Sequence, residues 1–476
     1  MISLVERAAC IRELVSQLGE SKVRTTPEDL AAYETSVRHG SGLAAFAVLP
    51  GSTDEVSATL RCCLRHGITV IAQGANTGLV GAASPDSIGT HAILSLEKMS
   101  TLIEIDRINR SVLTSAGVRL SALNAKLAEH ELVFPIDLGA DPSIGGMIAT
   151  NTGGARFIRY GDVRRSVLGL EVVLADEKGT VLNMTGGLRK NNAGVDLKQL
   201  FIGTGGAFGV ITRAEIEVQT LARHVATALV VPNSEDVVTE LLVGAERVFG
   251  ETLTSFEGMS RNAMECVFRH MPRARNPFLP DPVPAYALLI ETTSTGESED
   301  GGAELQQRLN AFLERSLKSG TITNAVFDHA DQLWTIRHSI SEALQQEGRV
   351  IGLDIGLRRG DVSKFHTDAR ALVEKHFPWL KIFDFGHCGD GGDHFNLVWP
   401  KDGAPDFDNA RASEAREALY SLVVEKYRGS FSAEHGIGPL NQIYYKKFTA
   451  DSNKAFAGRI AQMFNPNDLL GRFSLN

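Results

Sequence analysis

The chain has 476 residues, enough for two or three domains with a sizeable core. It is 43% hydrophobic and 22% charged, as in ordinary globular proteins, and its formal net charge of −9 argues against a sequence-independent nucleic-acid-binding surface. The five cysteines form no CxxC pair and suit a reducing compartment. No uncharged apolar run reaches the roughly 18 residues of a membrane span. We therefore expect a cytoplasmic protein.

The first half of the chain mixes short β segments, helices and glycine-rich turns. Residues 1–19 have apolar positions at helical spacing interrupted by charges, which predicts a surface helix rather than a secretory signal. From residue 40 to about 217, β runs alternate with helices. Ser52 is placed to cap one helix that Gly67 closes. From about 218 the strands and helices become longer, which indicates a second, α+β unit.

A glycine loop, QGANTGLVGAA (73–83), follows the strand ITVIA directly. Backbone N–H groups in such a turn can cradle a pyrophosphate. The spacing matches neither a Walker A loop nor GxGxxG, and in GTGGAFG (203–209) Phe208 stands at the third-glycine position. A nicotinamide Rossmann site is therefore disfavoured. Taken alone, the 73–83 loop is either a structural turn or a ligand cradle.

A second glycine-rich stretch, PIDLGADPSIGGMIATNTGG (135–154), is followed by RYGDV and LGLEVVLADEKG. Together with the first loop, these long ordered motifs resemble the FAD-binding domain of the vanillyl-alcohol oxidase / p-cresol methylhydroxylase flavoproteins. The resemblance covers nearly the whole chain. Within that superfamily it is closest to the D-2-hydroxy-acid dehydrogenases, which include D-2-hydroxyglutarate and D-lactate dehydrogenases.

The resemblance implies an α+β protein with a two-subdomain, p-cresol-methylhydroxylase-type FAD domain over 1–217. A ferredoxin-like α+β substrate domain carrying a metal site would span 218–476, with roughly the last 50 residues packing back on the FAD domain. Thr77 stands where covalent relatives have histidine, so FAD is expected to bind non-covalently. The implied FAD-binding residues are Gln73, Gly74, Ala75, Asn76, Thr77, Gly78, Gly81, Pro135, Ser143, Gly145, Gly146, Thr150, Asn151, Gly154, Gly209 and Ile211.

The segment GHCGDGGDHFN (386–396) places His387 and His394 seven residues apart. On one continuous strand they would lie roughly 23 Å apart and on opposite faces. The Gly and Asp residues between them tolerate the positive φ angles of a tight turn. The segment therefore predicts a hairpin with facing imidazoles. Two ligands are too few for a metal, so other residues must complete a site.

A second polar motif, SAEHGIG (432–438), supplies a candidate third ligand. On an extended backbone Glu434 and His435 point to opposite sides, so one could bind a metal while the other faces a substrate. His387, His394 and Glu434 form a two-His, one-carboxylate set for a divalent ion, zinc first, with manganese or iron as alternatives. His435 would act as the base for a 2-hydroxy acid held at the open positions. Asp393, beside His394, is interpreted as a solvated turn residue.

The helix LWTIRHSISEALQQEG carries the residues that the resemblance assigns to the substrate. Arg337 matches the arginine that grips the substrate carboxylate, and Ser341 lies one turn further on. Asn396 and His435 complete the substrate set. Gly352 stands where the 2-hydroxyglutarate branch tends to carry lysine, which argues against a dicarboxylate unless Arg349 replaces that lysine.

The leading hypothesis is an FAD- and metal-dependent dehydrogenase that oxidises a D-2-hydroxy acid to the 2-oxo acid, with hydride passing to the flavin. Its partners would be an electron-transfer flavoprotein or quinone-linked carrier and a second copy of the chain, but no nucleic acid. One alternative is a metal-independent FAD oxidase or dehydrogenase of an alcohol or sugar lactone. Another is a non-enzymatic flavin- or metal-binding protein with a degenerate site. A nicotinamide dehydrogenase ranks last.

Overall fold

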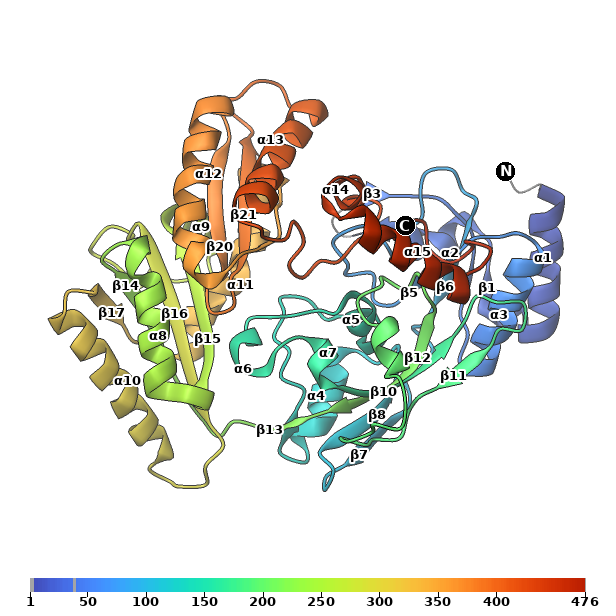
Figure 1. Cartoon of the computed structure of the whole chain (residues 1–476), viewed down its shortest axis with the longest axis horizontal. Coiled ribbons are helices and arrows are strands. Elements are labelled where there is room, and N and C mark those ends of the chain that lie inside the picture. The colour runs from blue at the N-terminus through green and yellow to red at the C-terminus, as the bar shows by residue number, and fades with distance from the viewer. Residues whose placement is uncertain (1–3, 37–39, 476) are drawn as a thin grey trace.

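The computed structural model (Figure 1) describes residues 4–36 and 40–475. Its N-terminal part contains a small four-stranded sheet. In pairing order its strands are β1 (Val23–Arg24), β4 (Ala44–Val48), β6 (His91–Ser95) and β5 (Val70–Gln73). β4, β6 and β5 run parallel, and their apolar side chains are buried. Ser52 caps α3 as predicted by accepting the Glu55 amide at 3.3 Å. The neighbouring elements are α1 (Leu4–Leu18), α2 (Pro27–Glu34), β2 (Thr35–Ser36), β3 (Gly40–Ser41) and α3 (Thr53–Arg65).

A five-stranded antiparallel sheet shares one core with the first. In pairing order its strands are β11 (Val181–Asn183), β10 (Val167–Val173), β12 (Val210–Glu217), β8 (Ser111–Ser115) and β7 (Ile103–Asp106). The central strand β10 reads VLGLEVV and is almost entirely buried, because both of its faces are covered. The other elements are α4 (Leu120–Ala128), β9 (Leu132–Val133), α5 (Ile144–Thr150), α6 (Phe157–Tyr160), α7 (Val163–Ser166) and β13 (Gln219–Thr220).

The second half of the chain is built on one eight-stranded antiparallel sheet. In pairing order its strands are β17 (Ile322–Val326), β14 (His224–Pro232), β16 (Tyr286–Ser294), β15 (Leu253–Ser260), β20 (Lys381–His387), β21 (Gly392–Pro400) and β18 (Gly348–Ile351), with β19 (Ile355–Gly356) also on β21. Its helices are α8 (Val238–Phe249), α9 (Arg261–His270), α10 (Gly301–Lys318), α11 (Ala330–Glu347), α12 (Val362–His376) and α13 (Asn409–Ser421). Apolar side chains of α9 and α11 pack on one part of the sheet, and those of α8 and α10 on another.

The predicted hairpin is present in this sheet, between β15 and the edge strands β18 and β19. β20 and β21 pair antiparallel, with His387 opposite Gly392 and His394 opposite Phe385. Gly391, in the turn, has φ +91° and would place a Cβ 2.2 Å from the Leu357 carbonyl oxygen, so the turn requires glycine there. The hairpin therefore fixes where both imidazoles stand.

The chain ends against its own N-terminal half (Figure 1). The π-helical turn Leu422–Lys426 leads into a loop, then α14 (Gln442–Phe448) and α15 (Asp451–Phe464). The Phe464 and Phe201 ring centroids lie 4.9 Å apart, and Leu470 and Phe473 are buried in the N-terminal core. The remaining short helical turns are Glu20–Lys22, Leu197–Leu200, Glu235–Val237, Gly250–Thr252 and Arg359–Asp361. None of the described helices is long and apolar enough to cross a membrane.

Candidate active site

The three predicted metal ligands come together. The rings of His387 and His394 lie 5.3 Å apart at 76° to each other, and Glu434 reaches them from the loop after β21 and α13. Glu434 Oε1 is 3.5 Å from His387 Nε2, and one donor atom from each of the three residues lies within 4.8 Å of the others. The three side chains can therefore hold one ion between them.

The electrostatics of this group suit a cation. Glu434 Oε1 is buried and has no hydrogen-bond partner among the described residues, which is costly unless a positive charge binds there. Burial and the neighbouring His387 lower the pKa of His394 well below its ordinary value, so its imidazole is neutral. Although burial acts in the opposite direction, His387 lowers the pKa of Glu434. Although burial lowers it, Glu257 and Glu434 raise the pKa of His387 well above its ordinary value, so a bound ion must displace the proton from its Nε2 atom. The neutral His394 and the ionised Glu434 already have the forms that bind a divalent metal.

Glu257, on β15, supports the group and was missed by sequence reasoning. Its side chain is 1% exposed, and Oε1 lies 2.9 Å from His387 Nδ1. A carboxylate at Nδ1 orients the ring and leaves Nε2 free for a metal. The signal in the sequence is weak, a single charge inside the buried strand LTSFEGMS. Only the fold places that strand beside the hairpin.

Arg337 lies on α11 and is held by the same carboxylate. Its Nε and Nη2 atoms lie 2.9 and 2.8 Å from Glu257 Oε2, and its guanidinium stacks over Phe385 at 4.7 Å. Glu257 thus connects the predicted substrate-binding arginine with a predicted metal ligand. Ser341 is half-buried one turn further along α11.

Asn396, on β21, faces Gly352, the position at which the 2-hydroxyglutarate branch tends to carry lysine. Its Nδ2 donates to the His394 carbonyl at 3.0 Å, and its Oδ1 would lie 3.3 Å from a Cβ on Gly352. Arg349 does not replace that lysine, because its guanidinium lies over the Phe407 ring at 4.4 Å.

Asp354 anchors the SAEHGIG loop. Its Oδ2 accepts the backbone amides of Glu434 at 2.9 Å and His435 at 2.8 Å. His435 stacks on His394 with 5.8 Å between ring centroids, and its side chain is 28% exposed. Glu434 therefore turns into the buried group, whereas His435 stays accessible beside it. The backbone bends at these two residues and is not extended, so both side chains lie near His394.

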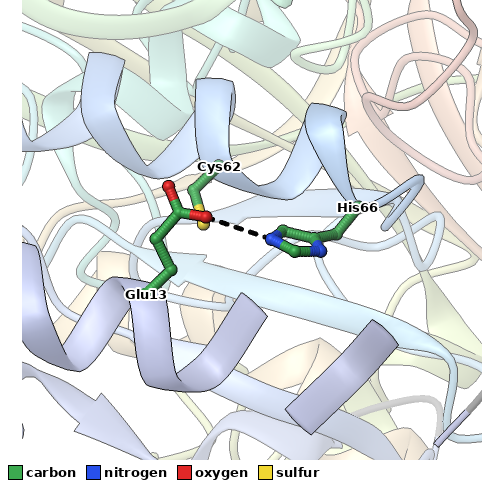
Figure 2. A group of neighbouring side chains, drawn as sticks. All are labelled: Glu13, Cys62 and His66. Carbon is green, nitrogen blue, oxygen red and sulfur yellow. Dashed lines mark hydrogen bonds and ion pairs between the residues drawn. The ribbon is translucent and has the colours of Figure 1, made fainter. Parts of the chain in front are cut away.

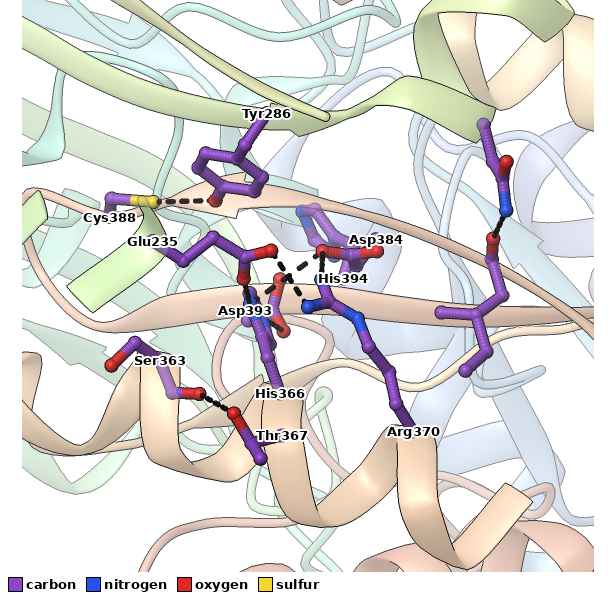
Figure 3. Close-up of polar contacts among 12 residues, drawn as sticks. Glu235, Tyr286, Ser363, His366, Thr367, Arg370, Asp384, Cys388, Asp393 and His394 are labelled. Carbon is purple, nitrogen blue, oxygen red and sulfur yellow. Dashed lines mark hydrogen bonds and ion pairs between the residues drawn. The ribbon is translucent and has the colours of Figure 1, made fainter. Parts of the chain in front are cut away.

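The interpretation of Asp393 as a solvated turn residue is wrong. Asp393 lies within β21, is 3% exposed and points to the opposite face from His394. Its Oδ2 lies 3.0 Å from His366 Nε2, and His366 Nδ1 lies 2.9 Å from Glu235 (Figure 3). Arg370 completes this polar layer behind the hairpin by pairing with Glu235 and Asp384.

The first glycine loop is shaped to expose backbone amides. Gln73 joins the two ends of the loop by donating to the Ala83 carbonyl at 2.8 Å, and it anchors the loop to α2 by donating to the Tyr33 carbonyl at 2.9 Å. Asn76 and Gly81 have φ of +55° and +73°. No amide from 74 to 81 donates a hydrogen bond to another described residue, which suits an anion such as a pyrophosphate. Ala75, Thr77 and Gly78 lie in the same segment.

The second glycine stretch connects this loop to the histidine group. A Cβ on Gly74 would lie 2.1 Å from Ser143 Oγ, and a Cβ on Gly153 would lie 2.5 Å from Glu434 Oε1. The two loops therefore touch each other, and the second touches the candidate metal ligand. A cofactor held by these glycines would adjoin any ion held by Glu434.

The other predicted cofactor residues divide into two groups. Gly145 packs on Ala116, Gly154 on the Asp137 carbonyl, and Asn151 ends α5 with φ +53°. Gly146, Thr150 and the buried Pro135 lie in the same stretch. Gly209 instead packs against Val172 of β10, and Ile211 is 4% exposed in the core.

Comparison with known proteins identifies the family of this chain. Residues 44–185 match the family described as FAD binding domain, and residues 221–473 match FAD linked oxidases, C-terminal domain. The chain belongs to the FAD-linked oxidases. This membership confirms an FAD-dependent oxidoreductase and the expected fold class.

Full-length relatives and solved structures agree with this membership. A D-2-hydroxyglutarate dehydrogenase of Arabidopsis thaliana is 34% identical over 96% of this chain and 80% of its own length. A D-2-hydroxyglutarate–pyruvate transhydrogenase of Saccharomyces cerevisiae is 31% identical over 94% of this chain and 90% of its length. The structure of p-cresol methylhydroxylase superposes with a TM-score of 0.74 at 17% identity, over 98% of this chain and 96% of that one, and supports the fold.

The prediction of a cytoplasmic location is wrong by this comparison. The Arabidopsis relative is named as mitochondrial, as are relatives from Danio rerio and Rattus norvegicus. Cysteine usage reports the redox state of a compartment and not which compartment it is. The five cysteines are all free and buried, which fits any reducing environment.

Proposed function

We propose that this FAD-linked oxidase oxidises a D-2-hydroxy acid to the 2-oxo acid with the help of a divalent metal, zinc before manganese or iron. The observation that carries the proposal is the buried Glu434 Oε1, which makes no hydrogen bond to a described residue and lies between two histidines and against Gly153 of the glycine stretch. An ion bound there would adjoin a flavin held by the glycine stretch. The names of the curated relatives support the hydroxy-acid substrate.

The surrounding residues have distinct roles in this proposal. When bound, FAD supplies the hydride acceptor and a divalent ion supplies the charge that lowers the pKa of the substrate hydroxyl. Arg337, oriented by Glu257, binds the substrate carboxylate. Ser341 and Asn396 are assigned to the substrate by resemblance. His435, held by Asp354 at its backbone amide, takes the hydroxyl proton.

The side chain of the substrate has two candidates. Relatives at 30–36% identity are named for D-2-hydroxyglutarate, which favours a second carboxylate. Gly352 lies beside Asn396 and provides no positive charge, and Arg349 does not supply one because it lies over Phe407. The lack of a cation for a second carboxylate favours a D-lactate-like acid instead. We place D-2-hydroxyglutarate first because the relatives named for it match nearly the whole chain, whereas the argument for D-lactate rests on one position.

The proposals for the electron acceptor and for the oligomeric state rest on the family resemblance. An electron-transfer flavoprotein or quinone-linked carrier is our first proposal, and the yeast relative's name adds a 2-oxo acid as a second. A homodimer is proposed on the same resemblance. Thr77 in the first loop supports non-covalent FAD, which acid precipitation would release into the supernatant.

Anaerobic stopped-flow bleaching of the flavin with D- and L-2-hydroxy acids, before and after chelation, tests the proposed reaction. We expect bleaching by the D-enantiomers only, with D-2-hydroxyglutarate faster than D-lactate, and loss of bleaching on chelation. Bleaching that survives complete metal removal would favour a metal-independent alcohol or lactone oxidase. Preference for L-enantiomers would exclude the proposal.

A further inference from the structure

Two helices far from the candidate active site present four metal-binding side chains to each other. Cys10 and Glu13 stand three residues apart on α1, and Cys62 of α3 stands four residues before His66, which caps the C-terminus of that helix. These spacings place each pair on one helix face. α1 packs against α3, and Figure 2 shows Glu13 facing Cys62 and His66 across the helix interface.

Three of the donor atoms are close enough to share an ion, and the Cys10 thiol approaches them beside Cys62. Cys10 Sγ lies 3.6 Å from Cys62 Sγ, and His66 Nε2 lies 3.1 Å from Glu13 Oε2. Donor atoms of Glu13, Cys62 and His66 all lie within 4.8 Å of one another. Zn–S bonds of about 2.3 Å at a tetrahedral ion give an S–S edge of roughly 3.8 Å, close to the distance between these two sulfurs.

We propose that Cys10, Glu13, Cys62 and His66 form a second metal site, which binds a thiophilic divalent cation of the zinc class and clamps α1 to α3. Four protein donors around a tetrahedral ion are typical of a structural site, closed to substrate. The site joins residues 52 positions apart in the chain, so an ion there would restrain the N-terminal helix.

The surroundings of the four side chains fit such an ion. Both thiols are fully buried, whereas the side chains of Glu13 and His66 are 31% and 21% exposed, so an ion can enter from the solvent side. Arg65 pairs with the other Glu13 oxygen, Oε1, and leaves Oε2 for the ion. Its positive charge balances the excess of two thiolates and a carboxylate over a divalent cation.

Without an ion the thiols are protonated. The neighbouring Cys10 and burial raise the pKa of Cys62. Metal binding must therefore displace thiol protons, and affinity should fall as the pH is lowered.

A second cluster in the described chain provides a matched comparison. The spacing C-x2-R-H of residues 62–66 recurs at 266–270, where Cys266 and His270 on α9 approach Glu347. Both clusters bring one Cys, one His and one Glu together, but among the described residues only Cys62 has a second thiol, Cys10, beside it. The Cys266 cluster therefore lacks the fourth ligand.

The proposed site and the candidate active site can be measured separately. α1 and α3 lie at the opposite end of the molecule from β20 and β21 (Figure 1), and the His387, His394 and Glu434 group contains no cysteine. A spectral signal from a metal–thiolate bond therefore reports the helix site alone. Its outcome does not depend on the proposed reaction.

Titration of the FAD-loaded protein with Co²⁺ under reducing conditions tests the proposal. We expect thiolate-to-cobalt charge transfer and the strong red bands of tetrahedral Co²⁺, beyond the absorption of oxidised flavin, saturating at one equivalent. Cys62→Ser and Cys10→Ser should lose or strongly weaken both bands, whereas Cys266→Ser should keep them. His66→Gln, which retains both thiols, should weaken Co²⁺ binding at least tenfold.

Thermal unfolding with and without Zn²⁺ gives a second readout that does not require the cysteine variants to bind cobalt. Zn²⁺ should raise the Tm of wild type and Cys266→Ser but leave that of Cys62→Ser unchanged, with FAD content equal in all three. The proposal is overturned if wild type shows no thiolate–cobalt band, if the band persists in Cys62→Ser, or if Cys266→Ser removes it.

Discussion

At the scale of single residues, the site depends on buried carboxylates that act on its histidines and arginine from behind. Glu257 bridges His387 and Arg337, and Asp354 holds the backbone of Glu434 and His435. The proximity of the candidate metal ligands could be predicted, because they stand in dense local motifs. Glu257 could not, because its partners lie 80 and 130 residues away in the chain.

Glu257→Gln should weaken metal binding about 10–100-fold while FAD stays bound, because the amide cannot orient His387 and neutralise Arg337 as a carboxylate does. Competition with a chelator measures the affinity. Glu291→Gln is the matched control, since Glu291 is equally buried on the neighbouring strand but pairs with Arg156 and Trp334. Equal metal affinity in wild type and Glu257→Gln would show that Glu257 does not position the ligand.

At the scale of elements, the β20–β21 hairpin presents different residues on its two faces. One face carries the candidate metal ligands, and the other carries Asp384 and Asp393 against α12. The turn residues predicted the hairpin. The burial of Asp393 was not predicted, because nothing in the local sequence reveals that His366 of α12 covers it.

His366 should make stability depend on pH. Despite burial, which lowers it, the nearby Asp393 and Asp384 raise the pKa of His366 to about 10. Because the pKa of His366 is higher in the folded state, its protonation stabilises the folded protein. This stabilisation is fully present below the unfolded pKa of about 6.5 and is lost as the pH rises through about 10. Glu235 and Arg370 also face this imidazole.

Urea unfolding at pH values from 6 to 10 measures this effect. The free energy of unfolding of wild type should fall across that window, and the fall should be smaller in His366→Gln. A His366→Gln protein with the same pH dependence as wild type would assign the effect to other groups.

At the scale of the whole molecule, the active site is assembled where the two halves of the chain meet. The glycine stretch belongs to the first half, and Glu434 comes from the second, yet Gly153 lies directly against Glu434 Oε1. The sequence motifs predicted both parts. Their contact follows from the return of the C-terminal segment, through Phe464 and Phe473, onto the N-terminal core.

Gly153→Ala should lower metal affinity, because its Cβ would stand 2.5 Å from Glu434 Oε1 and must displace that carboxylate. Gly194→Ala is the control, since a Cβ there meets nothing within 4 Å. Metal content and FAD content of both variants are measured after gel filtration. A Gly153→Ala protein with normal metal affinity would mean that Glu434 does not hold the ion from this position.

The central claim is that Glu434 binds the metal while its neighbour His435 accepts the proton, and paired variants test it most directly. Metal content and anaerobic flavin reduction by D-2-hydroxyglutarate are measured in Glu434→Gln and His435→Ala. Glu434→Gln should lose metal. His435→Ala should keep metal and FAD but reduce its flavin on the order of 10²–10⁴-fold more slowly, as expected for a lost general base. A His435→Ala protein that lacks metal, or that reduces its flavin at the normal rate, would contradict the account.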